Sequence, residues 1–219
     1  MAIFDEELAH LNGVVLQMGS LVEKAIKNSV QAVVERDDDL ARSVIEGDHL
    51  VNTLDIEIDE ESIRLIALRQ PMAGDLRLIT TAMKITTDLE RMGDLAVNIA
   101  QRAIELNKEP VLKAYVDIPR MREIAQGMTR DALDAFVSRD MKLAKDVIMR
   151  DDEIDDLKHK IMSELLFLMT ENSSIICRAM RITFVAQYLE RIADHATNIA
   201  EMVLYLIEGK IVRHSSILP

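Results

Sequence analysis

Hydrophobic residues recur every three or four positions through most of the chain, which is the spacing of one helix face. The run from Leu8 to Val33 shows this spacing, and it resumes after each short interruption. Helix-breaking residues are few and mark boundaries, as in QPMAG at 70–74 and NKEP at 107–110. The pattern predicts helices over about 6–36, 38–69, 75–108, 119–138, 140–170 and 173–209, and no strand.

The chain carries an internal repeat. LERMGDLAVNIA at 89–100 returns as LERIADHATNIA at 189–200, with eight of twelve residues identical at an offset of 100. A second match relates 44–48 to 147–151. Such a period indicates a duplicated supersecondary unit, and the apolar heptads in the third and sixth helices predict their core faces. We expect an all-α protein of two tandem three-helix bundles, one at 1–109 and one at 110–219, lying in line.

Composition narrows the class of protein. Hydrophobic residues make up 49% of the chain and charged residues 29%, which is typical of a folded domain. The net charge of −12 disfavours a nucleic-acid binder. A single cysteine excludes an internal disulfide, and Cys177, among Ile175, Ile176 and Ala179, is expected in the core. Because no signal peptide or long apolar run is visible, we expect a soluble cytoplasmic protein.

Acidic and amide side chains form rows on the helix faces opposite the apolar heptads. The third and sixth helices repeat the pattern Glu-x-x-x-Asp-x-x-x-Asn, and neither row contains Lys or Arg. The second and fifth helices add further acidic and amide positions at helical spacing, including Asn52, Asp55 and Asp59. The candidate ligands are Asp48, Glu90, Asp94, Asn98, Asp151, Asp155, Glu190, Asp194 and Asn198.

These carboxylates repel one another, so their presence at this spacing in both repeats calls for an explanation. Like charges four residues apart destabilise a helix, whereas a bound cation would reverse the effect. Oxygen ligands favour Mg²⁺, Mn²⁺, Ca²⁺ or iron over copper. His49 and His195 lie beside acidic positions and are either additional ligands or ordinary exposed side chains. The rows also suit a plain solvated face or a docking surface for a basic partner.

Enzyme signatures are lacking. There is no phosphate-binding glycine loop and no nucleophile elbow, and a single Glu-x-x-His at 7–10 is too little for a di-iron centre. We therefore predict a regulatory binding protein and no catalytic residues. A metal store or metal-dependent enzyme on an all-α scaffold is the second hypothesis, and a coiled-coil scaffold is the third.

The duplicated LER segments, together with RQPMAGDLR at 69–77, resemble the PhoU family of bacterial phosphate-uptake regulators over essentially the whole chain. The resemblance implies surface metal clusters, with iron in some members, held by Glu90 and Asp94 in one half and Glu190 and Asp194 in the other. Asp48 and Asp151 would be partners on neighbouring helices, and Asn98 and Asn198 possible additions.

The resemblance also implies a role. PhoU proteins are cytoplasmic adaptors that repress the phosphate-starvation response and high-affinity uptake when phosphate is plentiful. The expected partners are a sensor histidine kinase and the ATPase subunit of the phosphate transporter, and a homodimer is expected as well. Two departures suggest unequal metal sites: TENSS at 170–174 replaces QPMAG at 70–74, and Asn52 stands where the other repeat has Asp155.

Overall fold

The structure, a computed structural model, describes residues 2–112 and 116–209, and every regular element in these ranges is helical. The predicted all-α fold is therefore confirmed. The elements are α1 (Ala2–Glu35), α2 (Asp38–Arg69), α3 (Ala73–Leu106), α4 (Asp117–Ser138), α5 (Met141–Met149), α6 (Asp151–Glu171), the 3₁₀ turn η1 (Ser173–Ile175) and α7 (Ile176–Glu208).

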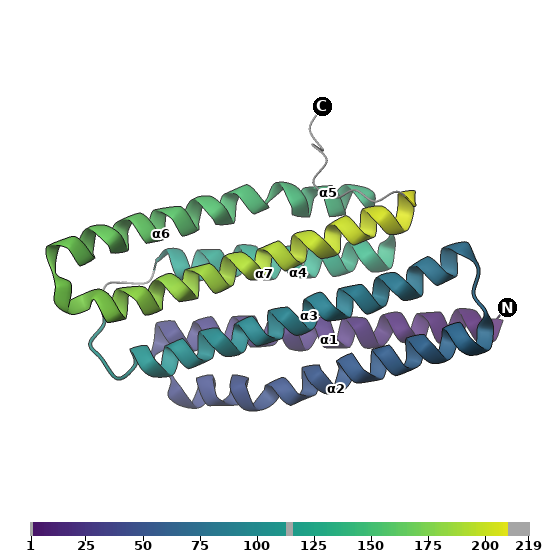
Figure 1. Cartoon of the computed structure of the whole chain (residues 1–219), viewed down its shortest axis with the longest axis horizontal. Coiled ribbons are helices and arrows are strands. Elements are labelled where there is room, and N and C mark those ends of the chain that lie inside the picture. The colour runs from purple at the N-terminus through teal and green to yellow at the C-terminus, as the bar shows by residue number, and fades with distance from the viewer. Residues whose placement is uncertain (1, 113–115, 210–219) are drawn as a thin grey trace.

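The two three-helix units lie side by side rather than in line (Figure 1). Helices α1, α3, α4 and α7 form a central four-helix bundle, in which α3 packs on α7 and α1 on α4. Helix α2 packs outside on α1 and α3, and α5 and α6 pack outside on α4 and α7. The in-line expectation was wrong because α3 and α7 bury apolar residues on two sides. One side faces their own unit, and the other faces the opposite unit.

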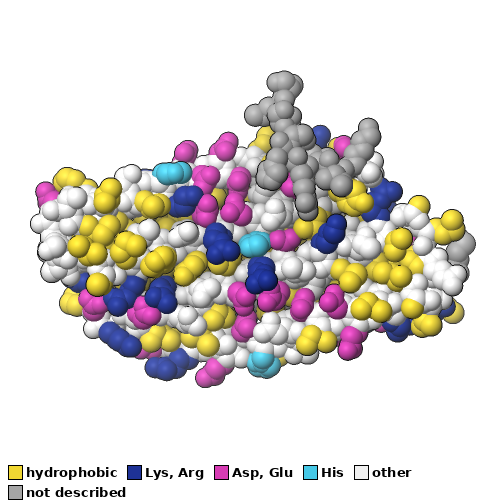
Figure 2. Space-filling model, viewed as in Figure 1, with side chains coloured by type: hydrophobic (Ala, Val, Ile, Leu, Met, Phe, Trp, Pro, Cys, Tyr) yellow, Lys and Arg dark blue, Asp and Glu magenta, His cyan; other side chains and the backbone are white. Residues whose placement is uncertain are grey.

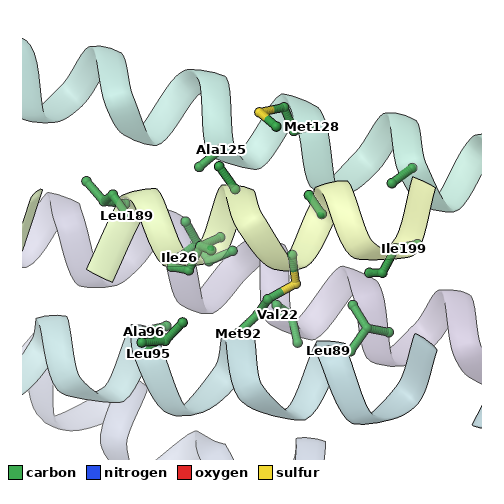
Figure 3. Packing of buried hydrophobic residues seen from close by; sticks show 14 of the residues in the cluster. Val22, Ile26, Leu89, Met92, Leu95, Ala96, Ala125, Met128, Leu189 and Ile199 are labelled. Atoms are coloured by element: carbon green, nitrogen blue, oxygen red, sulfur yellow. The ribbon is translucent and has the colours of Figure 1, made fainter. Parts of the chain in front are cut away.

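A single core runs through both units. The close view shows buried side chains from all four central helices, among them Met92 of α3, Leu189 of α7, Met128 of α4 and Ile26 of α1 (Figure 3). All four side chains are fully buried. Alanines such as Ala96 and Ala125 lie among them and allow the helices to approach closely. Hydrophobic burial therefore holds the two repeats together as one body.

Polar contacts set the register between α3 and α7. Arg181 of α7 binds Glu105 at 3.0 Å and Glu109 at 2.7 Å, while His195 Nδ1 lies 2.7 Å from Asp88 Oδ1. Higher-numbered residues of α7 thus contact lower-numbered residues of α3, so the two helices are antiparallel. Acidic side chains gather over both units on the face that Figure 2 shows.

Several local predictions need correction. The fifth predicted helix is interrupted at Arg150, which separates α5 from α6. Three acidic residues then occupy the first turn of α6, where the helix dipole favours them. The third helix begins at Ala73 rather than at residue 75, so Asp75 lies inside its first turn. Cys177 is exposed rather than buried, because it lies on the outward side of α7.

Asp37 caps α2 by accepting a hydrogen bond from the Leu40 amide at 2.9 Å. The heptad residues of α3 and α7 are buried as expected. In the described ranges, no helix is both long and apolar enough to cross a membrane.

Candidate metal sites

The acidic rows meet in two places, one in each repeat. The first acidic cluster consists of Asp48, Asn52 and Asp55 on α2 with Glu90 and Asp94 on α3. Asn52 Nδ2 donates to Asp48 Oδ2 at 2.9 Å. Because α2 packs lengthwise on α3, residues spaced three or four apart on each helix face one another across the pair.

Negative charge is crowded together in the first cluster. Partial burial raises the pKa values of Asp48, Asp55 and Glu90. Repulsion from Asp94 raises those of Asp48 and Glu90 further. The nearest cation is Arg91, whose Nε lies 3.5 Å from Glu90 and whose Nη1 lies 3.9 Å from Asp94. Since these distances are long and Arg91 is 59% exposed, it neutralises the cluster only weakly.

The second acidic cluster consists of Asp151, Asp155 and Lys158 on α6 with Glu190 and Asp194 on α7. Partial burial, followed by repulsion from Asp155, raises the pKa of Asp151. Partial burial, with repulsion from Glu190 and Asp151, raises the pKa of Asp194 to about 6. Four carboxylates thus compete for positive charge here too.

Lys158 supplies part of that charge. Its Nζ lies 2.7 Å from Glu190 Oε1 and 2.9 Å from Asp155 Oδ1, and its side chain is only 17% exposed. Burial opposes its positive charge, but the hydrogen bonds to Glu190 and Asp155 outweigh that effect and raise its pKa. The second cluster therefore contains an internal counter-ion between its two helices.

Repeat alignment shows how the clusters differ. Asp48 and Asn52 correspond to Asp151 and Asp155 at an offset of 103, and Asp55 then corresponds to Lys158. The two clusters therefore differ by a charge reversal at Asp55 and Lys158, and by an amide in place of a carboxylate at Asn52 and Asp155. The sequence shows this difference when the match between 44–48 and 147–151 is continued for seven more residues along both helices.

The structure brings together seven of the nine predicted ligands. Asn198 is directed elsewhere, since its amide donates to Asp88 across the repeat interface at 3.4 Å. Asn98 lies one turn beyond Asp94 on α3. His195 also faces Asp88 and not the cluster. Asp55 and Lys158 belong to the clusters but were absent from the predicted ligand set.

The donor sets differ in how well they suit a metal ion. Over the described ranges, no three His, Cys, Asp or Glu side chains converge closely enough to hold an ion in this arrangement. The first cluster nevertheless offers four carboxylates and one amide oxygen without a lysine, which suits a hard cation after side-chain rotation. A metal ion at the second cluster would have to displace Lys158 from its two carboxylate partners.

Fold and surface together define a class: a duplicated all-α protein whose two three-helix repeats share one core and each carry an acidic cluster. The chain belongs to the PhoU family, because the PhoU domain matches it twice, over residues 15–103 and 118–203. The predicted family is confirmed.

Related proteins match this chain in sequence over nearly its full length. A phosphate-specific transport system accessory protein PhoU homolog of Aquifex aeolicus is 47% identical over 212 residues, covering 97% of this chain and 96% of the relative. The homolog of Caulobacter vibrioides is 42% identical, covering 94% and 90%.

Solved structures show the same fold. The crystal structure of PhoU from Pseudomonas aeruginosa superposes with a TM-score of 0.91 at 41% identity, covering 94% of this chain and 100% of that one. The phosphate transport system regulatory protein PhoU from Streptococcus pneumoniae gives 0.90 at 30% identity, covering 96% and 99%.

Proposed function

We propose that this chain is a regulatory accessory protein of a phosphate transporter, which restrains uptake and the phosphate-starvation response when phosphate is plentiful. The observation that carries the proposal is the full-length likeness to relatives named for the phosphate-specific transport system. Its partners are the ATPase subunit of the transporter and a sensor histidine kinase. It acts in the cytoplasm, peripheral to those membrane complexes.

Binding to purified partners tests the regulatory role. We expect the chain to bind the isolated ATPase subunit, and to lower ATP hydrolysis by the assembled transporter at high phosphate. Deleting the gene should leave uptake and the starvation response active at high phosphate. Normal repression in the deletion strain would contradict the proposal, as would failure to bind both the ATPase subunit and the kinase.

A metal ion at the acidic clusters is the second part of the proposal. Asp48, Asp55, Glu90 and Asp94 would hold a hard cation such as Mg²⁺, Mn²⁺, Ca²⁺ or iron in the first cluster. Asp151, Asp155, Glu190 and Asp194 would hold one more weakly, because Lys158 already neutralises part of that site. The ion would offset repulsion between α2 and α3 and so tie the two helices together.

Elemental analysis separates the two sites. Glu90→Ala plus Asp94→Ala should remove most of the bound metal, whereas Glu190→Ala plus Asp194→Ala should remove less. Each double variant removes the same two residue types from equivalent positions, so each serves as the control for the other. Unchanged metal content in the first variant would overturn the metal proposal.

A homodimer remains a prediction of this proposal. Sedimentation equilibrium of the full chain between micromolar and tens of micromolar concentrations would show it. A single monomeric species across that range would contradict it.

A further inference from the structure

An apolar patch covers the end of the second repeat. It consists of six large side chains that are each between 37% and 62% exposed: Met162, Leu166 and Phe167 of α6, and Ile176, Met180 and Phe184 of α7. Hydrophobic side chains gather there over α6 and α7, at the left end of Figure 2. We call these residues the α6–α7 patch. It presents roughly 500 Å² of apolar surface, the size at which exposed patches are often functional.

Helix geometry makes the patch continuous. Lys158 contacts Glu190 across α6 and α7, and Met162 and Leu166 follow Lys158 at successive four-residue steps. Ile176, Met180 and Phe184 follow the same step along α7. Tyr188 extends the row, because its ring stacks on Phe184 with centroids 6.2 Å apart. The side chains thus line one shared face of the helix pair.

The duplicated fold shows that these residues are not needed for folding. At the equivalent positions the first repeat has Asp59, Ile63, Arg64, Leu76, Thr80 and Lys84. Four of those six residues are polar or charged, yet the first repeat forms the same three-helix unit. Asp88 likewise takes the place of Tyr188. Of these six positions in the first repeat, only Ile63 and Leu76 expose a large apolar side chain, so the continuous apolar row is found in the second repeat and needs an explanation other than stability.

Charge around the patch indicates what covers it. Asp155 lies seven residues from Met162, about 10 Å along α6. Within the part of the chain that the structure describes, Asp151 and Asp194 of the same cluster form no ion pair, since Lys158 is engaged by Asp155 and Glu190. The chain as a whole carries a charge of −12. A ligand that crosses the patch toward the middle of the molecule therefore needs apolar anchors followed by positive charge.

We propose that the α6–α7 patch binds an amphipathic helix of a partner protein, with apolar residues at helical spacing and Lys or Arg residues two to three turns further on. Two antiparallel helices with a shared apolar face form the groove that such a helix fits. The area is too small for a stable homodimer, which needs about 800 Å² from each chain. An anionic membrane is disfavoured because the acidic cluster would repel it.

A chemical reporter is already present at the patch. Cys177 is the only cysteine in the chain, and it is exposed next to Ile176. An environment-sensitive dye on Cys177 should brighten when an apolar helix covers the patch. The first probe is a synthetic 20-residue helix with leucines at i, i+3, i+4 and i+7 and lysines in its last two turns. The control peptide has glutamates in place of those lysines.

Variants borrowed from the first repeat test the patch itself. Met180→Thr plus Phe184→Lys installs residues that the fold accepts at the equivalent positions. Ile63→Thr plus Leu68→Lys is the matched control, because it removes two exposed apolar residues from the first repeat. We expect the patch variant to weaken binding of the lysine peptide at least tenfold and the control to change it less than twofold. Thermal unfolding of each variant checks that it is folded.

The choice of a natural partner rests on the proposed function, so the second probe is the purified ATPase subunit of the transporter. Loss of ATPase binding in the patch variant, with retention in the control, supports the inference. Equal binding by the patch variant and the wild type overturns it. If the wild type binds no ATPase subunit, the ATPase part of the proposed function fails, and the peptide measurement alone decides the patch.

Other occupants have distinct signatures. Wild-type self-association that the patch variant abolishes would assign the patch to a second copy of this chain. Binding to phosphatidylglycerol vesicles that the patch variant abolishes would assign it to a membrane. Equal affinity for the lysine and glutamate peptides would remove the electrostatic part of the inference. Each of these results overturns the proposal as stated.

Discussion

The two repeats use the same helix pair to hold a group of carboxylates, but they neutralise it differently. In the second acidic cluster, Lys158 lies between Asp155 and Glu190 at hydrogen-bond distance. In the first, Asp55 takes the place of the lysine and adds to the negative charge. The second cluster is thus partly neutralised by its own lysine, whereas the first would need an external cation for the same neutralisation. A duplication can preserve a fold while one substitution changes what its surface requires.

Reversing the charge at Lys158 should have the largest effect. Lys158→Asp leaves five clustered carboxylates with no lysine, so we expect a loss of about 2–4 kcal/mol in the free energy of unfolding. The measurement is urea denaturation in EDTA, repeated with Mn²⁺ or Mg²⁺. Added metal should restore much of the loss, because the variant now resembles the first cluster.

Lys158→Met is the control for this prediction, since it removes the positive charge without adding a negative one. It should destabilise the chain less than Lys158→Asp and respond less to metal. Equal stability of the wild type and Lys158→Asp in EDTA would show that Lys158 does not neutralise the cluster.

The reciprocal change should stabilise the metal-free protein. Asp55→Lys places an ammonium group between α2 and α3, where it can reach the carboxylate of Glu90. We expect a gain of about 1 kcal/mol in EDTA, as for a partly buried charged hydrogen bond. Metal content should fall at least tenfold, since the lysine competes with the ion. A variant that keeps its metal would contradict the proposed equivalence of Asp55 and Lys158.

The sequence predicted a large part of this architecture because periodicity and repetition are local signals. Helix positions and the apolar faces of α3 and α7 followed from them. The side-by-side arrangement did not, because a heptad row indicates which face is buried but not which neighbour covers it. The same limit explains Asn198, which extends the acidic row in sequence but donates to Asp88 across the repeat interface. It also explains Cys177, because only Ile175 and Ala179 among its apolar neighbours are buried, whereas Ile176 is exposed with it.

A pH titration would measure the repulsion inside the second cluster. The pKa of Asp194 is about 6 in the fold, compared with 3.8 for an ordinary aspartate, because of partial burial and nearby carboxylates. Between these values the folded chain holds a proton that the unfolded chain has lost. Stability in EDTA should therefore fall as the pH rises from about 4 to 6, and Asp194→Asn should reduce that fall.

Glu7 provides a control of opposite sign. Hydrogen bonds from Arg69 and Arg64 lower its pKa, so its contribution to stability is lost as the pH falls through the acid range. Glu7→Gln should therefore reduce the loss of stability at low pH. It should leave the fall in stability between pH 4 and 6 unchanged. Denaturation profiles of Asp194→Asn that match the wild type at every pH would show that Asp194 is not under repulsion.

The smallest predicted effect concerns a glycine that lies beside the first cluster. Gly93 lies inside α3, where the second repeat has the buried Ala193. A methyl group at Gly93 would lie 3.4 Å from Val51 Cγ1 and 3.5 Å from Asp48 Oδ1, which are ordinary contact distances. Gly93→Ala should thus stabilise the metal-free chain by about 0.5–1 kcal/mol, because alanine favours the helix.

The same methyl group should act differently on metal binding. It removes space beside the Asp48 carboxylate, so that oxygen has less freedom to rotate toward an ion, and we expect a few-fold loss of metal affinity. Ala193→Gly is the mirror experiment, and it should destabilise the second repeat by a similar amount. If Gly93→Ala raises stability without weakening metal binding, the glycine plays no part in the difference between the clusters. That difference would then rest on the Asp55–Lys158 and Asn52–Asp155 exchanges.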